Sequence, residues 1–208
     1  MTDSARALLR RGLDELCLEA SDEQRATLIG LAGLLETWAR RINLTGHHTL
    51  DAIVERLILE AAALLATLPS LESVADLGSG AGFPGLPIAI LRPDVRVTLV
   101  ESRSRRHHFQ RAAIRELGIP NALPVLGRAE ELESQPHAVV IAQAMARPAR
   151  ALRWMVRWAA PGGLLILPAA ERPPEIPQIA GLSVEEPIRY SVPCGGPRRT
   201  LLLARRVG

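Results

Sequence analysis

The sequence predicts an α/β fold in which a mostly parallel sheet carries helices on both faces and follows a helical N-terminal segment. Residues 1–68 carry apolar side chains at helical spacing, whereas short apolar runs alternate with helical stretches after Ser73. Such alternation is typical of parallel strands joined by crossover helices. We therefore expect an N-terminal helical cap at residues 1–70 and an α/β core at residues 71–208.

The composition is that of a globular protein. Hydrophobic residues make up 48% of the 208 positions and charged residues 23%, which excludes a wholly disordered chain. No apolar run is long enough to span a bilayer, and charges occupy the N-terminus where a signal peptide needs an apolar stretch, so we expect a cytoplasmic protein without membrane contact. Cys17 and Cys194 stand far apart and form no disulfide or metal-binding motif.

All 25 basic residues are arginine, and the sequence pI is about 9.6. Codon bias would produce the same composition. Guanidinium groups also suit phosphate partners, because they offer a planar fork that binds two oxygens at once.

The helical segment contains two helix starts. Ser21 and Gln24 have the spacing of a capping box, and apolar residues then recur at helical spacing as far as Ile42. Thr49 is the expected N-cap of the next helix, which Pro69 ends.

The core follows in a regular order. We expect strands at 73–77, 96–101, 122–126, 138–142 and 163–168, with helices at 87–93, 104–117 and 148–160 between them. Residues 171–178 are a proline-rich loop. Residues 182–192 and 198–206 are separated only by a short CGGP turn, which predicts an antiparallel pair that closes the sheet.

The strongest chemical signal is the segment 76–85, DLGSGAGFPG, between the first strand and its helix. Three of its glycines, Gly78, Gly80 and Gly82, stand at alternate positions; they let the chain turn sharply and let a ligand approach the backbone. The GxGxG spacing differs from that of dinucleotide and triphosphate loops, and it is the first motif of Rossmann-like methyltransferases that use S-adenosylmethionine. A tight turn that binds no ligand is the alternative.

Two further segments belong to the same edge of the sheet. Glu101 ends the second strand, 19 positions after Gly82, where a carboxylate can accept hydrogen bonds from both ribose hydroxyls of a nucleoside. Ala129 and Glu130 follow the third strand, and Glu130 or the adjacent backbone could meet an adenine amino group. The first turn of a short helix would explain that segment equally well.

Several segments together closely resemble the bacterial small-subunit ribosomal RNA methyltransferase G family, also called glucose-inhibited division protein B. They are NLT at 43–45, DLGSGAGFPGLPIAI at 76–90, LRPDVRVTLVES at 91–102, RR at 105–106, RELG at 115–118 and GRAEEL at 127–132. The resemblance implies a Rossmann-like class I methyltransferase that moves a methyl group from S-adenosylmethionine to N7 of a guanine in the 530 loop of 16S ribosomal RNA. It places cofactor contacts at Gly78, Phe83, Glu101, Ala129 and Glu130.

This chain departs from the family on the acceptor side. The family has an arginine in a Ser-Arg-Ala segment after the fourth strand, where this chain has Gln143, which we also assign to the cofactor site. Two other family segments are changed at residues 56–61 and 167–169. The alternatives are therefore a weakened or non-catalytic relative that binds cofactor and RNA, or a methyltransferase with a different acceptor.

Transfer to guanine N7 needs no catalytic side chain, because N7 already carries a free lone pair and the enzyme chiefly aligns the reactants. We expect no metal, since adjacent histidines such as His107 and His108 diverge; we expect both on a solvated helix face. Arginines concentrate in 103–106 and 147–157, where RNA contact and simple solvation are both open. The expected RNA-binding residues are Arg56, Arg105, Arg106 and Arg147.

Overall fold

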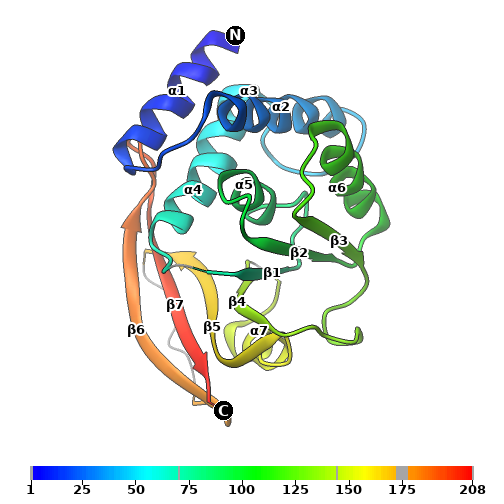
Figure 1. Ribbon diagram of the computed structural model, residues 1–208, viewed down its shortest axis with the longest axis vertical. Helices are drawn as coiled ribbons and strands as arrows, with labels where there is room; N and C mark the ends of the chain where they lie inside the picture. Colours follow the sequence, from blue (N-terminus) through cyan, green and yellow to red (C-terminus); the bar gives the residue numbers. More distant parts are fainter. Residues whose placement is uncertain (1, 70, 144, 172–177, 208) are drawn as a thin grey trace.

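The protein is seen in a computed structural model that describes residues 2–69, 71–143, 145–171 and 178–207. In these described residues, seven α-helices, one π-helical turn between α3 and α4, and seven strands follow one another along the chain (Figure 1). Their bounds are α1 (Thr2–Glu15), α2 (Asp22–Ala39), α3 (Leu50–Ile53), the π-helical turn η1 (Val54–Ile58), α4 (Leu59–Ala66), β1 (Ser73–Leu77), α5 (Gly85–Leu91), β2 (Arg96–Glu101), α6 (Ser104–Leu117), β3 (Ala122–Leu126), β4 (His137–Ala142), α7 (Pro148–Met155), β5 (Ala159–Ala170), β6 (Leu182–Ser191) and β7 (Arg198–Arg206).

The strands form one mixed sheet in the order β3-β2-β1-β4-β5-β7-β6. The first five are parallel, and β7 runs antiparallel to both β5 and β6. The order reverses between β1 and β4, so the carboxyl ends of these strands meet at the place where open α/β sheets bind ligands. The predicted α/β fold and the antiparallel closing pair are confirmed.

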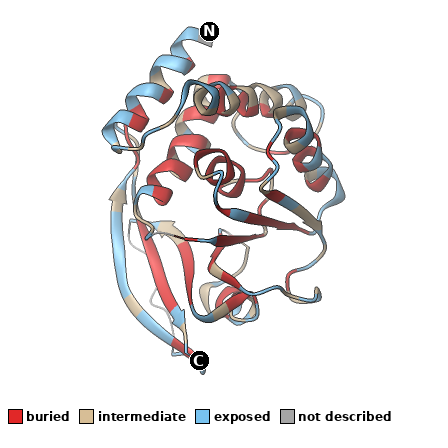
Figure 2. Ribbon diagram, viewed as in Figure 1, coloured by how far each residue is buried: buried red, intermediate tan, exposed pale blue. Residues whose placement is uncertain are grey.

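Alternate residues of the sheet pack into two separate buried clusters. Val74 and Ile141 face a cluster that also contains Leu9 and Leu31 of the N-terminal helices. Their neighbours in sequence belong to the opposite cluster, which includes residues of α7. The period of two in the strands therefore gives each face its own helical cover. The central strands are buried accordingly (Figure 2).

The N-terminal helices start at the predicted residues. Ser21 accepts a hydrogen bond from the Gln24 backbone, and the Gln24 side chain accepts one in return from the Ser21 backbone. Thr49 caps α3 through a bond from Ala52 N–H. These caps satisfy N–H groups that would otherwise lack a partner inside the helix.

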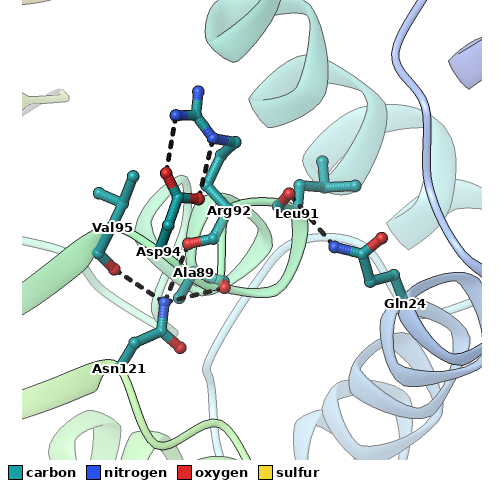
Figure 3. Close-up of polar contacts among 7 residues, drawn as sticks. All are labelled: Gln24, Ala89, Leu91, Arg92, Asp94, Val95 and Asn121. Atoms are coloured by element: carbon teal, nitrogen blue, oxygen red, sulfur yellow. Dashed lines mark hydrogen bonds and ion pairs between the residues drawn. The ribbon is translucent and has the colours of Figure 1, made fainter. Parts of the chain in front are cut away.

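Two amides fix the C-terminal end of α5 (Figure 3). The Gln24 side chain donates to the carbonyl oxygen of Ile90 at 2.9 Å. It also donates to that of Leu91 at 3.2 Å, as Figure 3 shows. Asn121 donates from one nitrogen to three carbonyl oxygens in and after α5, between 2.8 and 3.1 Å away. Because these carbonyls have no partners within the helix, the two amides anchor α5 between α2 and the start of β3.

The predicted helix over 148–160 is wrong at its C-terminal end. Helix α7 stops at Met155, and β5 already begins at Ala159, because the Trp158 carbonyl accepts the His137 N–H and its indole donates to the Ala129 carbonyl. Most of the predicted loop 171–178 lies outside the described residues. None of the described helices is long and apolar enough to cross a membrane.

Candidate functional site

The glycine loop turns at the carboxyl end of β1 through three residues with left-handed backbone angles. The φ values of Gly78, Gly80 and Gly82 are +69°, +59° and +90°. An added Cβ at Gly82 would lie 2.5 Å from Leu86, whereas one at Gly80 would meet nothing closer than an Arg106 nitrogen at 3.8 Å. Gly82 is therefore required by packing, and the space in front of Gly80 is open to a ligand.

Glu101 lies directly against this loop. One carboxylate oxygen accepts the Gly80 N–H at 2.9 Å, the other accepts the Arg103 N–H at 2.8 Å, and Arg106 lies 3.8 Å away. The side chain is only 4% exposed. The loop itself rests on β2, because Gly78 and Ser79 both donate to the Val100 carbonyl. The spacing in the sequence thus brings the glycines and the carboxylate together in space.

The segment after β3 meets the same edge. Gly127 N–H donates to the Glu101 carbonyl at 3.0 Å, which places the following residues beside the end of β2. Ala129 is buried and accepts the Trp158 indole bond, while Glu130 is partly exposed and lies 3.8 Å from Arg128. Both residues predicted for the cofactor are therefore near Glu101, although the Ala129 carbonyl already has a partner.

Gln143 follows β4 and is exposed. It lines a small cavity of about 30 Å³ together with Arg56, Glu60, Phe83 and Tyr190. The cavity therefore joins Phe83 of the glycine loop to three elements far apart in sequence, and it brings the predicted residues Arg56 and Gln143 to one place.

The predicted arginines fall in different surroundings. Arg105 and Arg147 are exposed at the starts of α6 and α7. Arg106 instead turns toward the loop between Glu101 and Gly80. His107 lies on the buried side of α6 and is only 8% exposed, so its predicted solvated position is wrong. The next residue, His108, is exposed. Burial is the main cause that lowers the pKa of His107.

Three residues of the site were not assigned from the sequence. Asp76 is buried below the loop; one carboxylate oxygen accepts the Gly85 N–H at 2.9 Å, and the other has no partner in the described part of the chain. Burial raises the pKa of Asp76 to about 7. Gln110 of α6 donates to Ser79 Oγ and to the Gly80 carbonyl, both at 2.8 Å. Met145 lies over Gly78, with its sulfur 3.0 Å from the position of an added Cβ.

A signal for two of these residues exists in the sequence. Asp76 is the one charged residue of the strand Ser73–Leu77, and Gln110 is a polar residue three positions before Ala113 on the apolar face of its helix. Polar groups at such positions need partners. No comparable signal marks Met145.

The fold and the glycine loop define a class of protein, the Rossmann-like methyltransferases that use S-adenosylmethionine. Solved structures of similar fold include MtNAS in complex with S-adenosylmethionine (TM-score 0.58, 16% identity, 100% of this chain and 98% of that chain) and a methyltransferase from Aquifex aeolicus (TM-score 0.56, 15% identity, 75% and 93%). At these identities the likeness shows the fold alone.

The chain belongs to the rRNA small subunit methyltransferase G family. A model of that family matches residues 24–179. Curated ribosomal RNA small subunit methyltransferases G from Chromohalobacter salexigens and Deinococcus radiodurans are 33% and 34% identical to it, each over 99% of this chain and over 100% and 87% of their own lengths. The family resemblance of the motifs is confirmed.

Proposed function

We propose that this protein transfers a methyl group from S-adenosylmethionine to N7 of a guanine in the 530 loop of 16S ribosomal RNA, in the cytoplasm. The observation that carries the proposal is the contact between Glu101 and Gly80, in a chain that belongs to the methyltransferase G family. This contact brings two features together at the carboxyl edge of the sheet: a glycine with open space in front of its backbone, and a carboxylate placed where such folds bind a ribose.

The residues present fit the cofactor. Gly80 leaves open space, and the Glu101 oxygen that accepts the Gly80 N–H keeps a further lone pair for a hydroxyl donor. Asp76 carries a buried oxygen that lacks a partner. S-adenosylmethionine supplies an electrophilic methyl group when it is bound. The proposed cofactor residues are Gly78, Gly80, Gly82, Phe83, Glu101, Ala129, Glu130 and Gln143.

The protein's own part in the reaction is alignment. Guanine N7 is unprotonated, so no side chain has to remove a proton before it reacts. The cavity between Phe83, Gln143 and Arg56 adjoins the loop and is the proposed entry of the base. It has room for a water molecule and not for a base, so Arg56 and Gln143, at its rim, have to move when the base enters. Arg105 and Arg147, exposed beside this edge, are the proposed phosphate contacts.

The test uses small ribosomal subunits from cells that lack the gene. Purified protein and isotope-labelled S-adenosylmethionine are added, and mass mapping locates 7-methylguanine in 16S RNA. We expect one labelled guanine in the 530 loop, and strongly reduced labelling by Glu101→Gln, which keeps the size of the side chain. Cofactor binding without any labelling of RNA would favour the non-catalytic relative instead, and labelling of small molecules alone would favour a different acceptor.

A further inference from the structure

A second feature on the surface lies away from the cofactor loop. A shallow groove of about 630 Å³ runs between α2, the outer side of α6 and β3. Its apolar part includes Trp38 of α2 and Pro124 of β3. Its polar part is formed by four residues of α6: His108, Arg111, Arg115 and Glu116. Helix α6 lies between α2 and β3 and contacts both (Figure 1).

The Trp38 indole, which lines this groove, is held in place by packing. It is partly exposed, and its ring meets the fully buried Phe109 at 5.6 Å between centroids and an angle of 71°. This edge-to-face packing fixes the indole without covering it. A fixed and accessible aromatic ring can stack on any nucleobase, because every base has a π-face.

The cations of the groove are weakly compensated. Among the described residues, no carboxylate lies within 4.0 Å of Arg111, and Arg115 meets only the exposed Glu116 at 3.6 Å. Such an exposed pair contributes little and leaves the guanidinium available. Arg111 and His108 also help to lower the pKa of the adjacent His107, as expected where positive groups are close together.

The groove is continuous with the site edge through α6. Arg105, His108, Arg111 and Arg115 are spaced by three, three and four residues, so they lie on one stripe of the helix. Arg105 is in the first turn, two residues after the Arg103 N–H that bonds to Glu101. The stripe extends about 15 Å from Arg105 to Arg115, at a rise of about 1.5 Å per residue. An RNA strand that leaves the site would follow it for several nucleotides.

We propose that the groove binds a nucleotide of the RNA strand flanking the target base, with the base stacked on Trp38 and its phosphates between Arg111 and Arg115. The proposal rests on the proposed function, because it takes the substrate to be RNA. The combination of a fixed ring with weakly compensated guanidinium groups favours a nucleotide over an acidic peptide, which would use the charges and leave the ring unused.

The test separates stacking from charge with a single-stranded RNA 12-mer and the abasic form of the same chain. Trp38→Leu should weaken binding of the RNA about tenfold and leave binding of the abasic chain unchanged, since stacking needs the base. Trp38→Phe, which keeps an aromatic ring against Phe109, should retain most of the affinity. Melting temperatures show that each variant is folded.

Charge is tested with Arg111→Ala and Arg115→Ala combined. This variant should weaken the binding of both the RNA and the abasic chain. It should also make the slope of log affinity against log salt shallower by about 1.4, because each phosphate contact of a single strand accounts for about 0.7. Arg6→Ala with Arg10→Ala is the matched control: both are exposed arginines of α1 at the same spacing. The control should behave like the unmodified protein.

In the methylation assay, the groove variants should raise KM for small subunits and leave kcat and cofactor affinity unchanged. The inference is overturned if Trp38→Leu weakens binding of the RNA and of the abasic chain equally, or weakens neither. It is also overturned if the arginine variant binds like the α1 control, or if an oligoglutamate competes for the groove as well as RNA does. These outcomes leave the proposed function standing as long as the unmodified protein labels 16S RNA.

Discussion

Arg199 of β7 and Glu60 of α4 form a two-point ion pair that joins the N-terminal helices to the end of the sheet. The distances are 2.8 Å from Nε to Oε1 and 3.3 Å from Nη2 to Oε2. Tyr190 is the residue directly opposite Arg199 in the neighbouring strand β6. Glu60 and Tyr190 both line the cavity beside Gln143, so this pair shapes the proposed entry of the base.

The first prediction concerns the contribution of this pair to stability. Glu60→Ala leaves a partly buried guanidinium without its partner, and we expect the free energy of unfolding to fall by about 1–3 kcal/mol. Glu185→Ala is the control, because Glu185 pairs with the more exposed Arg205 at 2.6 Å. There the expected loss is about 0–1 kcal/mol. Urea titrations measure both losses of unfolding free energy. Equal losses in the two variants would contradict the prediction that the more buried pair contributes more stability.

The second prediction concerns the hydroxyl of Tyr190. It is buried without a hydrogen-bond partner among the residues that the structure describes, and burial raises its pKa, with Glu60 adding to the effect. A buried donor without a partner destabilises a protein by about 1–3 kcal/mol. Tyr190→Phe should therefore raise the melting temperature while the ring keeps its packing. A lower melting temperature would show that the hydroxyl has found a partner, for which the carboxylate of Glu60 is the candidate.

The sequence patterns correctly predicted those parts of the molecule that depend on interactions between residues close together in the sequence. The Ser21 and Thr49 caps and the glycine loop each rest on interactions within a few positions of the chain. The division into a cap at 1–70 and a core stays a prediction, although one buried cluster contains residues of both. The end of α7 was missed because Trp158 is held by partners about 20–30 positions earlier, which no local pattern contains.

The cavity beside Gln143 could not be predicted for the same reason. Glu60 and Arg199 are 139 positions apart, and only the antiparallel pairing of the last two strands brings Tyr190 next to them. Arg106 and His107 show a further limit. A run of basic residues indicates a polar helix face, but only the packing of α6 decides that one side chain turns to Glu101 and the next is buried.

The third prediction concerns the pH dependence of stability at Asp76. Its pKa is about 7 in the folded protein and about 3.8 in the unfolded chain, so the unfolded chain releases this proton first as the pH rises. Stability contributed by the neutral carboxyl is full below about pH 4 and is lost by about pH 7. The loss is a few kcal/mol, since one pKa unit corresponds to about 1.4 kcal/mol.

The measurement is the difference in unfolding free energy between the unmodified protein and Asp76→Asn across that range. The difference should shift steadily in favour of the variant between about pH 4 and 7 and then level off. Asp94→Asn is the control: the exposed Asp94 pairs with Arg92, which lowers its pKa, so its difference should not follow this course. A flat curve for Asp76→Asn would mean that the carboxyl is ionised in the folded protein.

The fourth prediction separates ligand approach from backbone strain at Gly80. Gly80 and Gly118 have φ values of +59° and +64°, and neither has an atom within 3.4 Å of an added Cβ. Valine at either position should cost stability to a similar degree, because a branched side chain disfavours this backbone region. Calorimetric titration with S-adenosylmethionine should show binding lost in Gly80→Val and unchanged in Gly118→Val. Unchanged affinity in both would remove the loop from the cofactor site.

The last prediction concerns Gln143, where the family has an arginine. Gln143 is exposed after β4 and shares its cavity with Arg56 and Phe83, so it lies between the proposed cofactor loop and the proposed RNA contacts. Glutamine offers one amide, whereas arginine brings a fixed charge and a two-point fork. Gln143→Arg should raise methyl transfer to small subunits about tenfold, the effect of one hydrogen bond to a charged group, and leave cofactor affinity unchanged.

Gln143→Met, of similar length and without charge, should give no such gain. Tritiated-methyl incorporation measures transfer, and a cofactor titration of each variant accompanies it. Equal or lower incorporation by Gln143→Arg at unchanged cofactor affinity would contradict the prediction, and it would indicate that Arg56 and the residues around it are already adapted to glutamine.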